Sequence, residues 1–124
     1  MNPKAAKTQS CLLIPIYDAD VWIVVAQDIG KERKEWEDLM GPAPPDEDYD
    51  ALCSHNGGAT FALFFAKKRL CRKTVEHEIF HLTHRIFAWV GAPFVEANHE
   101  PAALLHAYLT ETIFSELRKM KLNI

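Results

Sequence analysis

The pattern of apolar and polar residues predicts three short strands in the first half of the chain. Residues 11–17 are mostly apolar, and Pro15 among them favours an edge position in a sheet, because proline cannot donate a ladder hydrogen bond. Residues 21–26 are almost entirely apolar, which is typical of a strand covered on both faces. Residues 18–20 form a turn between these segments, so the two strands fit a hairpin. Residues 60–66 form the third predicted strand.

Three helices are predicted from apolar residues at helical spacing. The first covers residues 29–40 and is ended by Gly41 and the prolines that follow it. The second is long, covers residues 74–90 and ends at Gly91. The third covers residues 98–119. Each of the three has one face that is apolar enough to pack against a sheet or another helix.

The order of these elements, β-β-α-β-α-α, predicts an α+β domain in which a small three-stranded sheet packs against a layer of helices. The stretch 46–58 is expected to be irregular, because it is acidic and closes on an Asn-Gly-Gly turn signal. The 124 residues are expected to form a single domain, with residues 1–10 as a flexible segment.

Composition and charge narrow the classes of function. The net charge of −3 gives no electrostatic reason to expect nucleic acid or an anionic membrane surface as the main partner. No stretch reaches the length of a membrane span, and the polar N-terminal residues do not resemble a signal peptide. The three cysteines lack a disulfide spacing pattern, which is typical of a reducing cytoplasm. We therefore expect a cytoplasmic protein, whose oligomeric state the sequence does not indicate.

The candidate chemistry lies in the second predicted helix, which contains the pattern His-Glu-x-x-His at residues 77–81. Side chains at positions i and i+4 lie one turn apart on the same face of a helix, so His77 and His81 can converge on one Zn²⁺ ion. The intervening Glu78 points to the side of this pair. There it can take a proton from a water on the zinc instead of binding the metal.

The two faces of this helix support that interpretation. At about 100° per residue the histidines share one stripe, and the opposite stripe is apolar. We expect the apolar stripe to pack on the sheet and the histidine stripe to face a cleft. The histidine stripe contains His77, His81, His84 and Ala88, and the apolar stripe contains Val75, Ile79, Leu82, Ile86 and Trp89. His84 is interpreted as lining the pocket rather than binding the metal.

A third metal ligand is expected from the last helix, because catalytic zinc usually takes three protein ligands and one water. Glu100 is the first candidate, with His99 as its rival and Glu96 as a weaker one. Glu100 belongs to a stripe that we expect to face inward, formed by Glu100, Leu104, Ala107, Glu111 and Phe114. Tyr108 is a candidate donor to a developing oxyanion, and a place in the core is its alternative.

On residues 77–81 and Glu100, the sequence resembles the zincin metallopeptidases of the gluzincin type, in which a glutamate on a following helix joins two histidines. It also resembles small single-domain HExxH proteins of bacteriophages and prophages, through the short loop after the helix and the pair Tyr108-Leu109. The resemblance covers residues 74–116. It implies a minimal zincin-like arrangement of strand, HExxH helix, loop and C-terminal helix, and a location in the cytoplasm of an infected bacterium. Leu104 departs from the gluzincin pattern, which often has an acidic residue there to orient a histidine.

Together these residues predict a zinc-dependent metallopeptidase that hydrolyses a bond in a peptide or protein substrate. Zn²⁺ would be held by His77, His81 and Glu100, and Glu78 would be the general base. An exposed edge strand would hold an extended peptide by strand addition. The alternative is a non-catalytic phage protein that uses the zinc site as a structural or docking element, which would usually require four protein ligands. A third possibility is hydrolysis of a non-peptide amide, such as a cell-wall bond.

Overall fold

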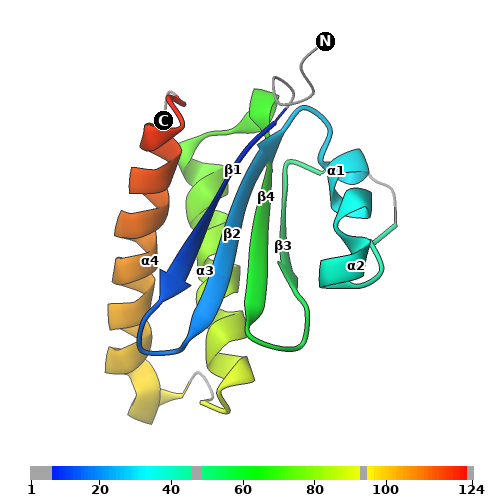
Figure 1. Ribbon diagram of the computed structural model, residues 1–124. Coiled ribbons are helices and arrows are strands. Elements are labelled where there is room, and N and C mark those ends of the chain that lie inside the picture. Colours follow the sequence, from blue (N-terminus) through cyan, green and yellow to red (C-terminus); the bar gives the residue numbers. More distant parts are fainter. Residues whose placement is uncertain (1–6, 46–48, 93–94, 123–124) are drawn as a thin grey trace.

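The computed structural model describes residues 7–45, 49–92 and 95–122, which form a mixed sheet with helices on both faces (Figure 1). Its main elements, in chain order, are β1 (Lys7–Ile14), β2 (Ala19–Ala26), α1 (Ile29–Glu35), α2 (Glu37–Met40), β3 (Ala51–His55), β4 (Thr60–Ala66), α3 (Arg72–Trp89) and α4 (His99–Lys119). The short 3-10 helices η2 (Lys67–Arg69) and η3 (Glu96–Asn98) precede α3 and α4. The predicted α+β class is confirmed.

The predicted number of strands is wrong, because the sheet has four strands in the order β1-β2-β4-β3. The additional strand, β3, lies in the stretch that we expected to be irregular, and it pairs with β4 in an antiparallel hairpin. All five of its residues are half-buried, so its sequence shows neither clean alternation nor a fully apolar run. The Asn-Gly-Gly signal is the turn of this hairpin, where Gly57 has a φ of +88°.

The first hairpin is confirmed, with a shift in its first strand. β1 pairs antiparallel with β2 from Lys7 to Ile14, so it begins and ends earlier than predicted. Lys7–Ser10, which we expected to be flexible, belong to this strand. Pro15 follows the last strand residue and ends the strand instead of lying within it. The predicted edge position of β1 is confirmed.

The central strands β2 and β4 run parallel and are covered on both faces, as predicted for β2. On one face, Val21, Ile23 and Val25 pack in a core cluster with residues of α3 and α4. On the other face, Val24 and Ala26 pack in a second cluster with residues of α1 and α2. Because successive side chains of a strand point to opposite faces, an almost continuous apolar run satisfies both layers.

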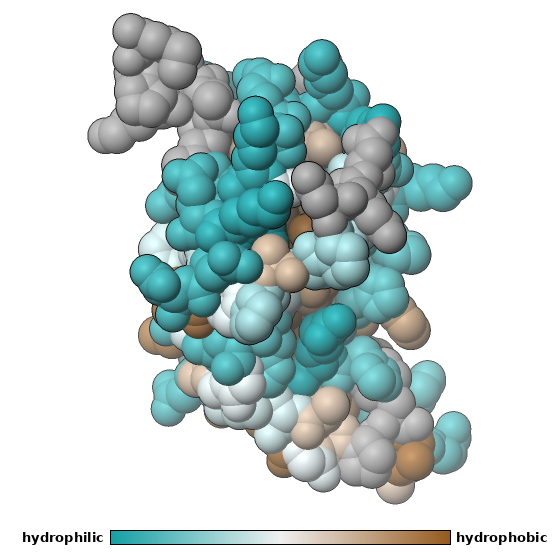
Figure 2. Space-filling view, turned by 90° about the vertical axis from the view of Figure 1, so that its right-hand side faces the viewer, coloured by the Kyte–Doolittle hydropathy of each residue, from teal (hydrophilic) through white to brown (hydrophobic). Residues whose placement is uncertain are grey.

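The predicted helix over residues 29–40 is divided at Trp36 into α1 and α2. Asp28 caps α1 by accepting a hydrogen bond from the Lys31 amide. The Trp36 ring packs edge-on against Phe64 of β4, which holds this pair of helices on the sheet. Their outward surface is predominantly hydrophilic, as Figure 2 shows from that side. This layer lies on the opposite face of the sheet from α3.

The two long helices cover the other face of the sheet. In α3 the predicted apolar stripe is confirmed: Val75, Ile79, Leu82 and Ile86 are fully buried, and Trp89 is partly buried. In α4 the predicted inward stripe is wrong. Its residues Glu100, Ala107 and Glu111 are exposed, and Leu104 is 64% exposed, whereas Phe114 is buried. The buried stripe is Leu105, Leu109, Ile113, Phe114 and Leu117. This phase buries aliphatic side chains and leaves the carboxylates in water, which avoids their desolvation cost.

Among the described residues, no helix has the combined length and apolar character that a membrane span requires.

Candidate functional site

The two histidines of the HExxH pattern lie together on the outward face of α3. The Nε2 atoms of His77 and His81 are 3.1 Å apart, and the centroids of the two rings are 4.7 Å apart. Two imidazole nitrogens that each lie about 2.0–2.1 Å from a tetrahedral zinc ion are about 3.3 Å from each other. The pair therefore has a separation that suits two ligands of one ion. Without a metal, the same separation suits a hydrogen bond from a protonated nitrogen to an unprotonated one.

Glu78 lies beside this pair and is largely buried. Its side chain is 9% exposed, and its Oε2 is 3.9 Å from Nε2 of His77, whose side chain is 66% exposed. Burial raises the pKa of the Glu78 carboxyl above its usual value, and neighbouring positive charges partly offset this rise. Those charges belong to His81, His77 and Arg85. The carboxyl is thus close enough to the histidines to accept a proton from a group bound between them.

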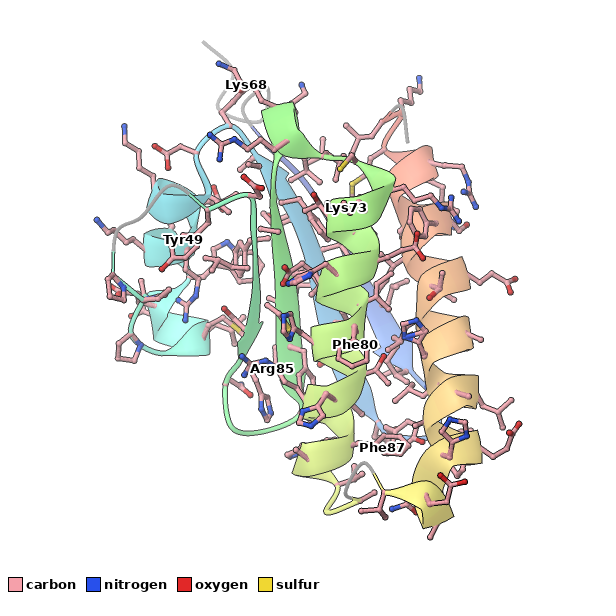
Figure 3. All side chains as sticks on the ribbon, turned by 180° about the vertical axis from the view of Figure 1, so that it is seen from behind. Tyr49, Lys68, Lys73, Phe80, Arg85 and Phe87 are labelled. Atoms are coloured by element: carbon pink, nitrogen blue, oxygen red, sulfur yellow. The ribbon has the colours of Figure 1, made fainter. Side chains whose placement is uncertain are left out.

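A side chain that the sequence analysis did not single out, Arg85, lies on the same side of α3 as Glu78. Figure 3 shows Arg85 reaching from α3 toward β3. It hydrogen-bonds the thiol of Cys53, whose pKa burial raises to about 12. Arg85 is four residues after His81, so the two are neighbours one turn apart. It is seven residues after Glu78, which puts it on the same side of α3 as Glu78 but about 10.5 Å further along the helix axis. That spacing is the sequence signal that would have identified it.

Glu100 and Tyr108 lie elsewhere. They line a hollow of about 480 Å³ between α4 and the turn that joins β1 to β2, and neither histidine lines it. Glu100 is in the first turn of α4, which begins beside the C-terminal end of α3 (Figure 1). His81 is eight residues before that end of α3, or about 12 Å along the helix axis. The structure therefore does not bring Glu100 to the histidine pair, and its role as third ligand stays a prediction.

The remaining candidates are divided between two surfaces. His84 is exposed on α3, one turn after His81. His99 and Glu96 line a groove between α3 and α4, together with Phe80. Within residues 7–45, 49–92 and 95–122, no group of three or more histidine, cysteine, aspartate or glutamate side chains is arranged to hold a metal ion. The described residues thus bring together two imidazole nitrogens and a neighbouring carboxyl, without a third group that could complete a metal site.

Comparison with protein-family models, with curated proteins and with solved structures finds no match to this chain. The zincin resemblance therefore rests on the sequence pattern alone, at residues 77–81, Glu100 and the pair Tyr108-Leu109.

Proposed function

We propose that this chain is a zinc-dependent hydrolase that cleaves a peptide bond, with His77 and His81 as two metal ligands and Glu78 as the general base. The observation that carries the proposal is the 3.1 Å separation of the two Nε2 atoms beside a buried carboxyl. The exposed face of α3 leaves room for water and substrate at this pair, which a catalytic site needs.

When bound, zinc supplies Lewis acidity, which polarises a substrate carbonyl and brings the pKa of a coordinated water near neutrality. Glu78 then has the central task among the protein groups. Its carboxylate accepts the proton of the attacking water and delivers it to the leaving amine. Its burial against β3 suits this task, because a desolvated carboxylate binds a proton more readily than an exposed one.

Two histidines hold a zinc ion incompletely, so the proposal needs at least one more ligand. We retain Glu100 as that candidate, which requires the first turn of α4 to move toward His81. His99 and Glu96 are its rivals, because the groove that they line adjoins Phe80, the neighbour of His81.

The proposed substrate is an extended peptide added to the edge of the sheet at β3. β3 is an outer strand and packs on α3, whereas the other edge, β1, is separated from β3 by two strands. A peptide beside β3 would pass on the Glu78 and Arg85 side of α3. Main-chain hydrogen bonds to β3 would supply affinity without demanding a particular sequence.

The structural-staple alternative is less well supported. A closed structural site usually uses four protein ligands, and the described residues gather only the histidine pair. We further propose a cytoplasmic location, which the three free thiols favour. Cleavage of a non-peptide amide, including a cell-wall bond, would use the same groups, and substrate profiling would separate it from peptide cleavage.

The test combines metal analysis with cleavage of a peptide library. We expect about one zinc per chain, lost in His77→Ala and His81→Ala, and retained in Glu78→Gln together with loss of cleavage. His84→Ala, on the same face one turn away, is the matched control for metal binding and should keep its zinc. A protein that binds no metal after zinc-replete expression, or a Glu78→Gln variant with full activity, would refute the proposal.

A further inference from the structure

The groove between α3 and α4 has the dimensions of a ligand site. Its volume is about 580 Å³, within the usual range of about 300–1,000 Å³ for such sites. Three alanines of α4 face Phe80 and Thr83 of α3, and their small side chains leave the space open. They are Ala102, Ala103 and Ala107. Glu96 and Asn98 of η3 and His99, the first residue of α4, also line the groove.

One wall of this groove is shared with the candidate metal site. Phe80 lies midway along α3 (Figure 3) and is 56% exposed. The centroid of its ring is 6.4 Å from that of His81, with the rings tilted by 64°. A group that packs against Phe80 in the groove would therefore lie one side chain away from His81, which does not itself line the groove.

The polar chemistry inside the groove is set by Thr83 and His106. The Thr83 hydroxyl donates its single hydrogen to the carbonyl oxygen of Ile79, at 2.9 Å. Thr83 Oγ1 also lies 3.4 Å from Nδ1 of His106, and with its hydrogen already used it can only accept there. A hydrogen bond between these two atoms therefore requires neutral His106 to carry its proton on Nδ1, which leaves Nε2 as an acceptor.

The position of that acceptor follows from burial and from the groove-lining residues. Among the described residues His106 Nε2 has no hydrogen-bond partner, yet no fully buried side-chain nitrogen or oxygen in this part of the chain lacks one. His106 Nε2 is therefore accessible, and His106 is one of the groove-lining residues. The groove thus combines an apolar wall and floor with an acceptor between the two helices.

We propose that this groove binds an aromatic substrate side chain that carries a hydrogen-bond donor, tyrosine being the simplest case. The ring would pack between Phe80 and the alanines, and the phenol would donate to His106 Nε2. A buried tyrosine hydroxyl needs such a partner, whereas phenylalanine would leave the acceptor unpaired. The assignment of the bound residue as part of a substrate rests on the proposed hydrolase, but binding itself needs neither zinc nor Glu78.

The test uses metal-free protein and two probes, N-acetyl-tyrosine amide and N-acetyl-phenylalanine amide, titrated by NMR. We expect the tyrosine probe to bind about threefold to tenfold more tightly, the value of one neutral hydrogen bond. His106→Phe keeps a ring of similar size and should bring the ratio to about one. Ala103→Trp should fill the groove and abolish binding of both probes. Glu96→Ala removes another acceptor that lines the groove and should leave the ratio unchanged.

A second measurement does not depend on whether His106→Phe folds. Long-range ¹H–¹⁵N correlation spectra should report His106 protonated on Nδ1, and Thr83→Val should remove that preference. Equal affinity for the two probes, no binding of either, collapse of the ratio in Glu96→Ala, or a His106 protonated on Nε2 would each overturn the assignment. These results are independent of metal content and cleavage, so failure of the groove and failure of the hydrolase are distinguishable.

Discussion

Removing both histidines of the HExxH pattern should leave the fold intact in metal-free protein. The double variant His77→Ala and His81→Ala deletes two outward-facing rings, and neither ring belongs to the hydrophobic clusters that cover the sheet. Exposed substitutions of this kind usually change the free energy of unfolding by less than about 0.5 kcal/mol. Alanine also has the higher helix propensity, so a small gain of a few tenths of a kcal/mol per site is expected.

With zinc bound, wild-type protein should become more stable than the double variant. An ion that binds only the folded state adds RT ln(1 + [L]/Kd), or about 2.7 kcal/mol at a concentration one hundred times its Kd. Wild-type protein should gain this amount and the double variant should gain none. Ile79→Ala, on the opposite face of α3, is the matched control. Ile79 is fully buried, so its truncation should cost about 2–5 kcal/mol with or without zinc.

The assay is urea unfolding followed by circular dichroism, with added zinc and with a strong chelator. The slope of the transition should be the same in all three proteins, because each exposes the same surface on unfolding. Chelated wild-type protein that is already unfolded, or a metal-free double variant that loses several kcal/mol, would contradict the reasoning. The first result would favour a structural zinc staple, whose fold depends on the metal. The second would show that the two histidine side chains stabilise the fold without any metal.

Three further predictions concern the scaffold. Cys71 is exposed and a side-chain hydrogen bond lowers its pKa, so iodoacetamide at pH 8 should label it well before Cys53, whose pKa burial raises to about 12; mass spectrometry of the labelled protein would read the order. Gly57→Ala should destabilise the β3–β4 hairpin by about 1 kcal/mol, because Gly57 has a φ of +88°, and thermal unfolding would measure the loss. A hydrogen bond from Ser10 lowers the pKa of Glu116 below its usual 4.5. This stabilisation is present above pH 4.5 and is lost as the pH falls through the lowered value, so Ser10→Ala should be less stable than wild type in urea at pH 7, and the difference should shrink in acid.

Strong side-chain periodicity made much of this fold predictable. The bounds of β4 and the apolar stripe of α3 follow directly from the sequence. In both, the buried positions are occupied by apolar side chains, so the sequence pattern alone marks them. The sequence does not predict β3, because all of its residues are half-buried and their side chains show no strand pattern. Its backbone pairing with β4 is what makes it a strand. In α4, Leu104 and Leu105 offer two apolar stripes one residue apart. Only packing against β1, β2 and α3 selects Leu105.

The candidate site likewise has a part that the sequence predicts and a part that depends on how the helices pack. His77 and His81 were predictable because both lie on one helix, where spacing alone fixes their relative position. The location of Glu100 depends on how the chain turns between α3 and α4, which spacing within a helix cannot specify. The groove was equally hidden, since Phe80 and His106 come from different helices and share no sequence pattern.

The order of residues around Ile79 links the proposed base, metal ligands and groove. Taking the buried direction of Ile79 as the reference, a rotation of about 100° per residue places Glu78 and Phe80 on opposite flanks of α3. The histidines at positions 77 and 81 then point outward between these flanks. The described contacts agree, because Glu78 lies toward β3 and Phe80 lies on the groove beside α4. A peptide segment that continues beyond the residues paired with β3 and turns across α3 to this groove would therefore pass over both histidines, with the base before them and the aromatic pocket after them.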